Sequence, residues 1–227
     1  VALGPAPLAS YNPQVNFFGH LAVATWYAQD PAHHLGAMLP DLATMLGTAA
    51  PTAARGSVAE GIELHHRTDA VFHACEHFRE LNRGAFETLE RRGVPRGAAR
   101  AVAHIGTEIL LDGVLAEHPG TRNAFQAALS HGATHEGELG LSWRNPPSEG
   151  RLAQLCKVIS ERDILKDSQL PERVAYRLDR ILGHRPRLRI PSSQLHLIEA
   201  WAAEADSEVR ERAEGLLTQV ARGLANR

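Results

Sequence analysis

Apolar residues recur at helical spacing along most of the chain. Between residues 16 and 27, Phe17, Phe18 and Leu21 follow the spacing of a buried helical face, and Asp30-Pro31 ends this segment. The same period continues in segments near 33–46, 57–92, 98–117, 121–131, 149–163, 171–184 and 192–224. No stretch alternates apolar and polar residues as a half-buried strand does. We therefore expect an all-α protein.

Two of these segments carry signals at particular positions. Pro40 lies inside the second segment, and a helix interior tolerates proline only at a break or kink. We therefore expect Asp41 at an irregular point of the backbone. Ser57 precedes Glu60 by three residues, the spacing of a capping box, and so predicts the start of one long helix that reaches about Arg92.

The composition is that of a folded globular protein. Residues 1–14 are rich in Pro, Ala and Gly without a period and predict a flexible N-terminal arm. Residues 15–227 then form a single compact helical domain, and the 44% apolar and 22% charged residues of the chain suit such a core. Cys75 and Cys156 lie in helical segments without metal-site or disulfide spacing.

The charge balance argues against several classes of partner. The chain has 24 Lys and Arg against 26 Asp and Glu, so it has no global basic field for nucleic acid or anionic lipid. No run of eighteen apolar residues and no signal-peptide pattern occurs. We expect a cytoplasmic protein with neither a nucleic-acid nor a membrane partner.

The 13 histidines are unusual, and the densest group suggests a metal site. His65 and Asp69 are four residues apart, so both side chains can reach one ion from the same helix face. Imidazole with carboxylate suits Mn²⁺, Fe²⁺ or Mg²⁺. The alternative is a hydrated helix face with a His-Asp pair. His73 and His77 continue the stripe, and for these we favour surface or packing roles.

A pair of acids interrupts an apolar helix later in the chain. Glu108 and Asp112 are also four residues apart, and burying both is costly unless a cation or hydrogen bonds compensate. We expect them at the edge of the core, with a solvent-facing position as the alternative. His104, one turn earlier, is either a partner that hydrogen-bonds to a metal ligand or a core imidazole, and we favour the core imidazole.

Two weaker signals complete the set. His20 lies on a Phe-rich helix and Asp41 follows Gly36-Ala-Met-Leu-Pro; alone, residues of this kind are usually structural. Arg185, Arg187 and Arg189 surround a proline, and guanidinium groups match phosphate oxygens, although a basic helix end is usually only a dipole complement.

Read in chain order, these motifs resemble the acyl carrier protein phosphodiesterase family. The matching segments are Asn16-Phe17-Phe18-Gly19-His20-Leu21, Gly36-Ala-Met-Leu-Pro-Asp41, Gly61-Ile-Glu-Leu-His65-His-Arg67-Thr-Asp69, Glu108 with Asp112, and Arg185-Pro-Arg187-Leu188. The resemblance covers about residues 16–190. Gly113 stands where the family usually places a histidine, Glu63 stands where some relatives carry another histidine, and the chain is only 5% aromatic.

The resemblance implies an α-helical fold related to the metal-dependent HD phosphohydrolases. It also implies hydrolysis of the phosphodiester that joins 4′-phosphopantetheine to a serine of the acyl carrier protein, with Mn²⁺ as the first choice of metal. The implied metal ligands are His20, Asp41, His65, Asp69 and Asp112. The implied phosphate contacts are Arg67, Arg185 and Arg187.

Physical chemistry suggests further roles within that scheme. Asp41 or Glu108 could orient or deprotonate the attacking water, and His65 or His66 could assist the departing serine oxygen. Carrier proteins are acidic, so docking favours a basic surface. Candidates for this surface are Arg83, Arg91, Arg92, Arg96 and Arg100.

Two alternatives stay open at the level of the sequence. The same metal core could act on a small phosphoester or a nucleotide. The chain could also be a non-catalytic helical protein that binds a carrier protein.

Overall fold

The computed structural model describes residues 17–52, 54–162 and 164–226, so the predicted arm at 1–14 lies outside it. Within these ranges the chain forms α-helices and short 3₁₀ turns and no strand, and the all-α prediction is confirmed. The helices are α1 (Phe17–Ala24), α2 (Pro31–Met45), α3 (Gly56–Phe72), α4 (Glu76–Arg91), α5 (Arg96–Leu115), α6 (Pro119–Thr134), α7 (Arg151–Glu161), α8 (Ile164–Asp167), α9 (Pro171–Leu182) and α10 (Leu195–Ala225). None of these helices is long and apolar enough to cross a membrane.

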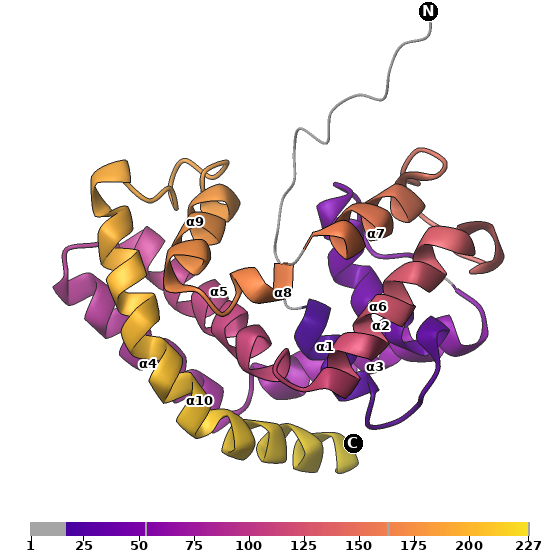
Figure 1. Cartoon of the computed structure of the whole chain (residues 1–227), viewed down its shortest axis with the longest axis horizontal. Coiled ribbons are helices and arrows are strands. Elements are labelled where there is room, and N and C mark those ends of the chain that lie inside the picture. Colours follow the sequence, from indigo (N-terminus) through magenta and orange to yellow (C-terminus); the bar gives the residue numbers. More distant parts are fainter. Residues whose placement is uncertain (1–16, 53, 163, 227) are drawn as a thin grey trace, which may run out of the picture.

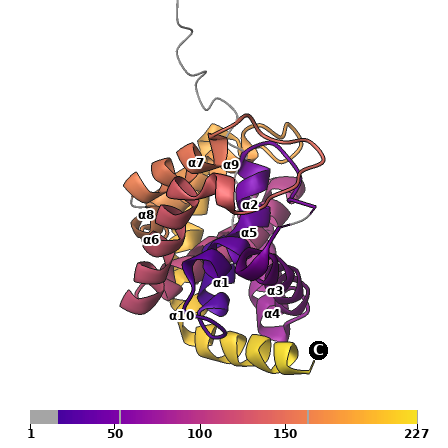
Figure 2. The ribbon, with the colours of Figure 1, turned by 90° about the vertical axis from the view of Figure 1, so that its right-hand side faces the viewer.

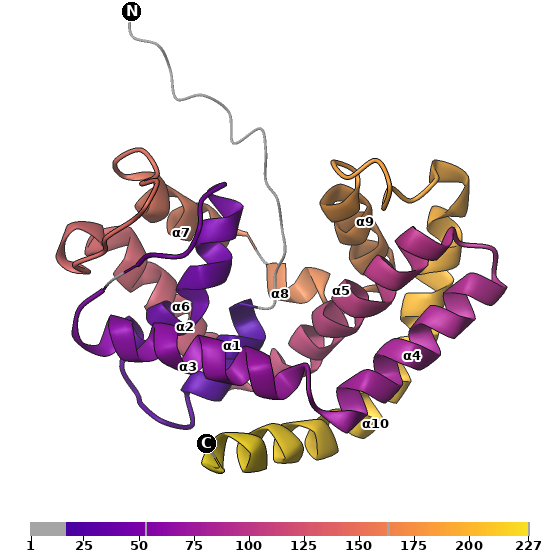
Figure 3. The ribbon, with the colours of Figure 1, turned by 180° about the vertical axis from the view of Figure 1, so that it is seen from behind.

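The helices gather around two apolar cores (Figures 1 and 3). One core lies among α1, α2, α6 and α7, where Phe17 and Phe18 pack against Phe125. The other lies among α4, α5, α9 and α10 and includes Trp201 and Ile109. The short helix α1 contacts α2, α3 and α5 and lies near the middle of the molecule (Figure 2). Residues on α1 are therefore placed where the two groups of helices meet.

Helices α2 and α3 cross at very close range because each has a glycine at the contact. A Cβ atom on Gly36 would lie 2.3 Å from the Val58 carbonyl oxygen, and one on Gly61 would lie 2.2 Å from the His33 carbonyl oxygen. Any side chain at either position would force the backbones apart. The crossing lies about one turn before Asp41 on α2 and before His65 on α3, so these glycines set how closely the two side chains approach.

The boundaries correct three local predictions. Asp41 lies inside α2 rather than at an irregular point, because α2 continues through Pro40. The predicted capping box is wrong: α3 starts after Arg55, and the Ser57 hydroxyl donates to the Asp30 carboxylate.

The long helix predicted to reach about Arg92 is two helices, α3 and α4, separated at His73–Cys75. The apolar period continues across this break, and Phe72 and Phe78 on its two sides contact each other with ring centroids 4.4 Å apart and an interplanar angle of 42°. No Gly or Pro marks the turn, so the sequence pattern does not reveal it. Both cysteines are free and buried, as their spacing predicted.

Candidate metal centre

Three helices bring His20, Asp41 and His65 together. One donor atom from each side chain lies within 4.8 Å of the other two, so the set can reach a single ion. The two imidazole rings face each other with centroids 3.8 Å apart. We call these residues the buried triad, because both histidines are buried and Asp41 is only partly exposed.

The backbone of α2 fixes the orientation of His65. Its Nδ1 lies 2.9 Å from the Ala37 carbonyl oxygen, a contact in which Nδ1–H donates and Nε2 keeps its lone pair. Burial lowers the pKa of His65 to about 4, so the ring stays neutral near pH 7. His65 is therefore held in the protonation state that a metal ligand requires.

His20 and Asp41 present buried polar atoms that have no partner within the described ranges. These atoms are His20 Nδ1 and Asp41 Oδ2. Burial, and secondarily the positive charge that a protonated His65 would carry, lowers the pKa of His20 well below its ordinary value. Burial raises the pKa of Asp41 to about 8, and repulsion from Asp69 and Asp112 adds to this shift. A divalent cation bound by the neutral imidazoles and Asp41 would compensate the repulsion between these carboxyl groups.

The acid pair on α5 is more deeply buried than predicted. Glu108 is 6% exposed and Asp112 is 1% exposed, so neither lies at the edge of the core or faces solvent. Burial raises the pKa of Glu108 well above its ordinary value and that of Asp112 to about 7. The positive charge of Arg177 and the Gly19 amide oppose the shift of Asp112. Asp112 thus has protein groups that compensate part of its charge.

Gly113 has a steric explanation in this fold. A Cβ atom there would lie 2.6 Å from the Ser168 carbonyl oxygen, just after α8, and Gln169 Nε2 donates to the Gly113 carbonyl oxygen at 3.2 Å. The segment after α8 therefore occupies the space that a histidine side chain would need. Arg177 donates to Ser168 Oγ at 2.9 Å and ties the same segment to α9.

A second group of donors lies where α3 ends beside α5. His73, His104 and Glu108 also have donor atoms within 4.8 Å of one another, and we call them the half-exposed triad. The interpretation of His104 as a core imidazole is wrong, because its side chain is 41% exposed. Asp69 Oδ1 lies 3.1 Å from His73 Nε2, and the hydrogen bond from His73 lowers the pKa of Asp69.

Asp69 connects the two triads electrostatically. Its charge raises the pKa of both His20 and His65, and its repulsion also raises the pKa of Asp41. The predicted residues His20, Asp41, His65, Asp69, Glu108 and Asp112 therefore belong to one polar region.

The other predicted site residues lie elsewhere. Arg67 donates to the Leu224 carbonyl oxygen at 3.1 Å, toward the end of α10. His66 is exposed, with its ring centroid 5.3 Å from that of His65. The turn with Arg185 and Arg187 packs against Gly97. Since α5 rises about 1.5 Å per residue, Gly97 is about 10 Å along the helix from His104 and about 22 Å from Asp112, so these arginines lie beside the start of α5, at the other end from Asp112.

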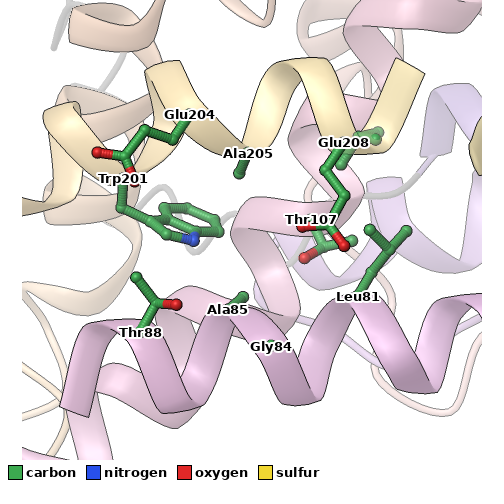
Figure 4. A pocket seen from close by; sticks show the side chains of 10 residues that line it. Leu81, Gly84, Ala85, Thr88, Thr107, Trp201, Glu204, Ala205 and Glu208 are labelled. Carbon is green, nitrogen blue, oxygen red and sulfur yellow. The ribbon is translucent and has the colours of Figure 1, made fainter. Parts of the chain in front are cut away.

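A separate pocket of about 90 Å³ lies between α4, α5 and α10 (Figure 4). Trp201, Glu204 and Glu208 from α10 lie opposite Leu81 and Ala85 from α4. None of the predicted site residues lines this pocket. Its residue Glu204 forms an ion pair with Arg92, with nitrogen and oxygen 2.5 Å apart.

Two members of the half-exposed triad and one neighbour of Asp112 were not predicted as site residues. His73 lies four residues after Asp69, and His104 lies four before Glu108, so the same spacing that selected the acids also marked these histidines. Only the tertiary approach of the end of α3 to α5 brings His73 to Glu108 and His104. Arg177 carried no signal in its own segment.

No family model, no curated protein and no solved structure matches this chain.

Proposed function

We propose that this protein is a divalent-metal-dependent phosphohydrolase whose metal is held by His20, Asp41 and His65. The observation that carries the proposal is the buried triad itself. Its two imidazoles and one carboxyl group come from three helices, lie within reach of one ion, and include unpartnered polar atoms. Such groups are costly to bury without a compensating charge.

The donor set indicates the class of metal. Imidazole nitrogen with carboxylate oxygen suits Mn²⁺ or Fe²⁺, and Mg²⁺ is the harder alternative. When bound, such a cation would supply Lewis-acid polarisation of a phosphoryl oxygen and would lower the pKa of water. The neutral state of His65 and its contact with Ala37 prepare the site for that ion.

Two further acidic residues beside the buried triad can transfer protons. Asp69 is ionised near neutral pH, because the hydrogen bond from His73 lowers its pKa, and it is the candidate to accept a proton from the attacking water. Glu108 keeps its proton more tightly, because burial raises its pKa, and it is the candidate to protonate the leaving oxygen. Arg177 and the Gly19 amide favour the charged form of Asp112, although burial still raises its pKa to about 7.

A basic pocket beside the half-exposed triad favours an anionic substrate. Arg79, Arg83 and Arg100 line a shallow pocket of about 290 Å³ between α4 and α5, together with Asn82 and Phe86. Asn82 also contacts His104 at 3.2 Å, so the pocket adjoins the polar region.

Among the arginines suggested for docking, two are already paired with acids. Arg92 binds Glu204 and Arg96 binds Glu90, whereas Arg83 and Arg100 line the basic pocket. The remaining candidate, Arg91, hydrogen-bonds to Glu87 and Thr88 on its own helix.

The proposed substrate is the phosphodiester between 4′-phosphopantetheine and the serine of an acyl carrier protein. The basic pocket fits the acidic surface of such a partner and the phosphate of the prosthetic group. Arg67, Arg185 and Arg187 have no phosphate contact in this proposal: Arg67 donates to the Leu224 carbonyl oxygen, and the turn with Arg185 and Arg187 packs against Gly97 near the start of α5.

The test is to incubate the full chain with holo-acyl carrier protein and Mn²⁺ and to follow the intact mass of the carrier. We expect loss of the 4′-phosphopantetheine group, and loss of this activity in Asp69→Ala and Asp41→Asn. Glu63→Gln is the matched control, because Glu63 is an exposed acid on α3 outside both triads. It should retain full activity.

The possible results separate the proposal from its alternatives. An unchanged carrier mass with hydrolysis of a small phosphodiester would replace the carrier protein by a small phosphoester or nucleotide as substrate. Metal binding without hydrolysis of either substrate would identify a non-catalytic protein. No bound metal, with Asp69→Ala equal to wild type in every assay, would overturn the proposal.

A further inference from the structure

The half-exposed triad has the geometry of a metal site distinct from the buried triad. His104 Nε2 lies 3.3 Å from Glu108 Oε1, and His73 Nε2 lies 3.9 Å from the same oxygen. Ligands that share a tetrahedral ion with bonds of about 2.1 Å lie roughly 3.4 Å apart. Small side-chain rotations would therefore bring these three atoms onto one ion, with His73 Nε2 exchanging its hydrogen bond to Asp69 for the bond to the ion.

The surroundings hold both imidazoles in place. The His73 and His104 rings stack with centroids 5.0 Å apart and an interplanar angle of 15°. Phe78 lies against both rings, at 5.3 Å from His73 and 5.4 Å from His104. Each imidazole is thus fixed on one side by an aromatic wall, while its side chain remains 35% or 41% exposed.

Asn82 can orient His104 for metal binding. The side-chain amide of Asn82 lies 3.2 Å from His104 Nδ1, and an amide can present either its NH₂ group or its oxygen to that nitrogen. With the oxygen turned inward, His104 Nδ1–H donates to it and Nε2 keeps its lone pair toward Glu108. An outer hydrogen bond of this kind accompanies most metal-binding histidines.

The carboxylates on either side of the triad favour a cation. Glu108 is 8% exposed at its side chain, and Asp69 contacts His73 at 3.1 Å. A hydrogen-bonded cluster, in which each neutral imidazole donates its Nε2–H to a carboxylate, is the alternative arrangement of these groups.

We propose that His73, His104 and Glu108 bind a second divalent transition-metal ion, with Asp69 positioned between this ion and the buried triad. Two imidazoles and one carboxylate are a donor set typical of Zn²⁺, Co²⁺ and Fe²⁺. The site opens to solvent, so it exchanges its ion more readily than the buried triad. This inference concerns binding and does not depend on phosphodiester hydrolysis; with the ion bound, Glu108 is a ligand and does not serve as the proton donor suggested above.

Equilibrium dialysis of the full chain against Co²⁺ alone, with metal analysis and visible absorption of the bound Co²⁺, tests the site. Wild type should bind two equivalents. His73→Asn/His104→Asn should bind one, with at least a tenfold loss of affinity for the other. His20→Asn should lose the other equivalent and keep the ion at the half-exposed triad.

His196→Asn is the matched control, because His196 is an exposed imidazole on α10 outside both triads. It should bind two equivalents. The single variant His104→Asn changes only one half-exposed side chain and provides the same test if the double variant does not fold. Far-UV circular dichroism checks the folding of both variants.

The outcomes distinguish this site from the proposed catalytic centre. Equal Co²⁺ stoichiometry and affinity in wild type and both His104 variants would overturn the second site and leave a hydrogen-bonded cluster only. One equivalent in wild type, lost in His104→Asn but kept in His20→Asn, would support the second site and contradict the buried triad as the metal centre.

Discussion

The buried triad and the half-exposed triad contain the same kinds of ligand in different surroundings. His20 and His65 lie in the interior at 4% and 7% exposure, whereas the side chains of His73 and His104 are 35% and 41% exposed. Burial lowers the pKa of His65 to about 4 and raises that of Asp41 to about 8. The comparison shows that the burial of a side chain, more than its type, determines the protonation state of each candidate ligand.

The triads also differ in how the chain assembles them. The buried triad draws on α1, α2 and α3 and depends on the close approach of Gly36 and Gly61. The half-exposed triad takes two ligands from consecutive turns of α5 and one from the residue that ends α3. The first is therefore the more sensitive to packing, and the second to local side-chain contacts.

Asp41→Asn should have the largest effect of any single substitution at the two triads. It removes the only carboxylate of the buried triad while preserving its shape, and we expect phosphodiester hydrolysis to fall by about a thousandfold or more. Without metal, the same variant should be more stable than wild type, because it no longer buries an ionisable group. Carrier mass and thermal unfolding in EDTA measure the two effects. Lower stability in EDTA together with full activity would contradict the assignment of Asp41.

Gly61→Ala should weaken the buried triad, because it disturbs the packing of α2 on α3, on which only that triad depends. The new methyl group meets the His33 carbonyl oxygen at 2.2 Å, so we expect a loss of about 3 kcal/mol of unfolding free energy and weaker binding at the buried triad. Urea denaturation and metal titration measure these. Gly84→Ala is the control, because no atom lies within 4 Å of a Cβ on this helical residue. It should gain up to about 1 kcal/mol. Equal effects of the two substitutions would contradict the close crossing.

The pH dependence of stability should reveal the buried carboxyl groups. In the unfolded chain they lose their protons near about pH 4, but in the metal-free fold Asp41 keeps its proton to about pH 8 and Asp112 to about 7. The folded state then binds more protons than the unfolded state, so raising the pH from about 6.5 to 8 should lower the unfolding free energy by on the order of 2 kcal/mol.

The histidines oppose this trend only weakly in the same window. His20 and His65 have lowered pKa values, so their contribution to stability is nearly complete above about pH 7 and is lost mainly as the pH falls below about 6.5. Urea denaturation in EDTA between pH 6.5 and 8 measures the slope. Saturating Mn²⁺ should remove most of it, since the cation favours the ionised carboxylates. An identical slope with and without Mn²⁺ would count against a metal at Asp41.

Asn82→Ala should have the smallest effect and should act on the half-exposed triad alone. It removes the amide beside His104 Nδ1, and loss of such an outer hydrogen bond weakens a metal site by about tenfold. Co²⁺ titration should show the weaker equivalent shifted and the tighter one unchanged. A shift of both equivalents would mean that the two triads are not separate sites.

The helical pattern established much of this molecule without reference to packing. The 3.6-residue period identified the helices, because one face of each had to be apolar. The four-residue spacings of His65 with Asp69 and of Glu108 with Asp112 gave the two rows of ligands, since such residues share a helix face. The resemblance of the motifs added His20 and Asp41. The fold brings both within reach of His65, but their role as metal ligands, like the phosphate contacts of Arg185 and Arg187, stays a prediction.

Tertiary structure decided which of these residues meet. The break at His73–Cys75 is invisible in the sequence, because no Gly or Pro marks it and the apolar period continues across it. The approach of α8 to Gly113, and of Arg177 to Asp112, joins segments that are more than fifty residues apart in the chain.

The sequence by itself determined the helices and the spacing of donors along each of them, because both follow from the local geometry of one helix. The depth of Glu108, the exposure of His104 and the meeting of His20 with Asp41 and His65 came only from the fold. These features depend on how helices that are distant in sequence pack against each other. Gly36 and Gly61 allow the close packing of α2 on α3 because neither has a side chain, and the two glycines lie on different helices.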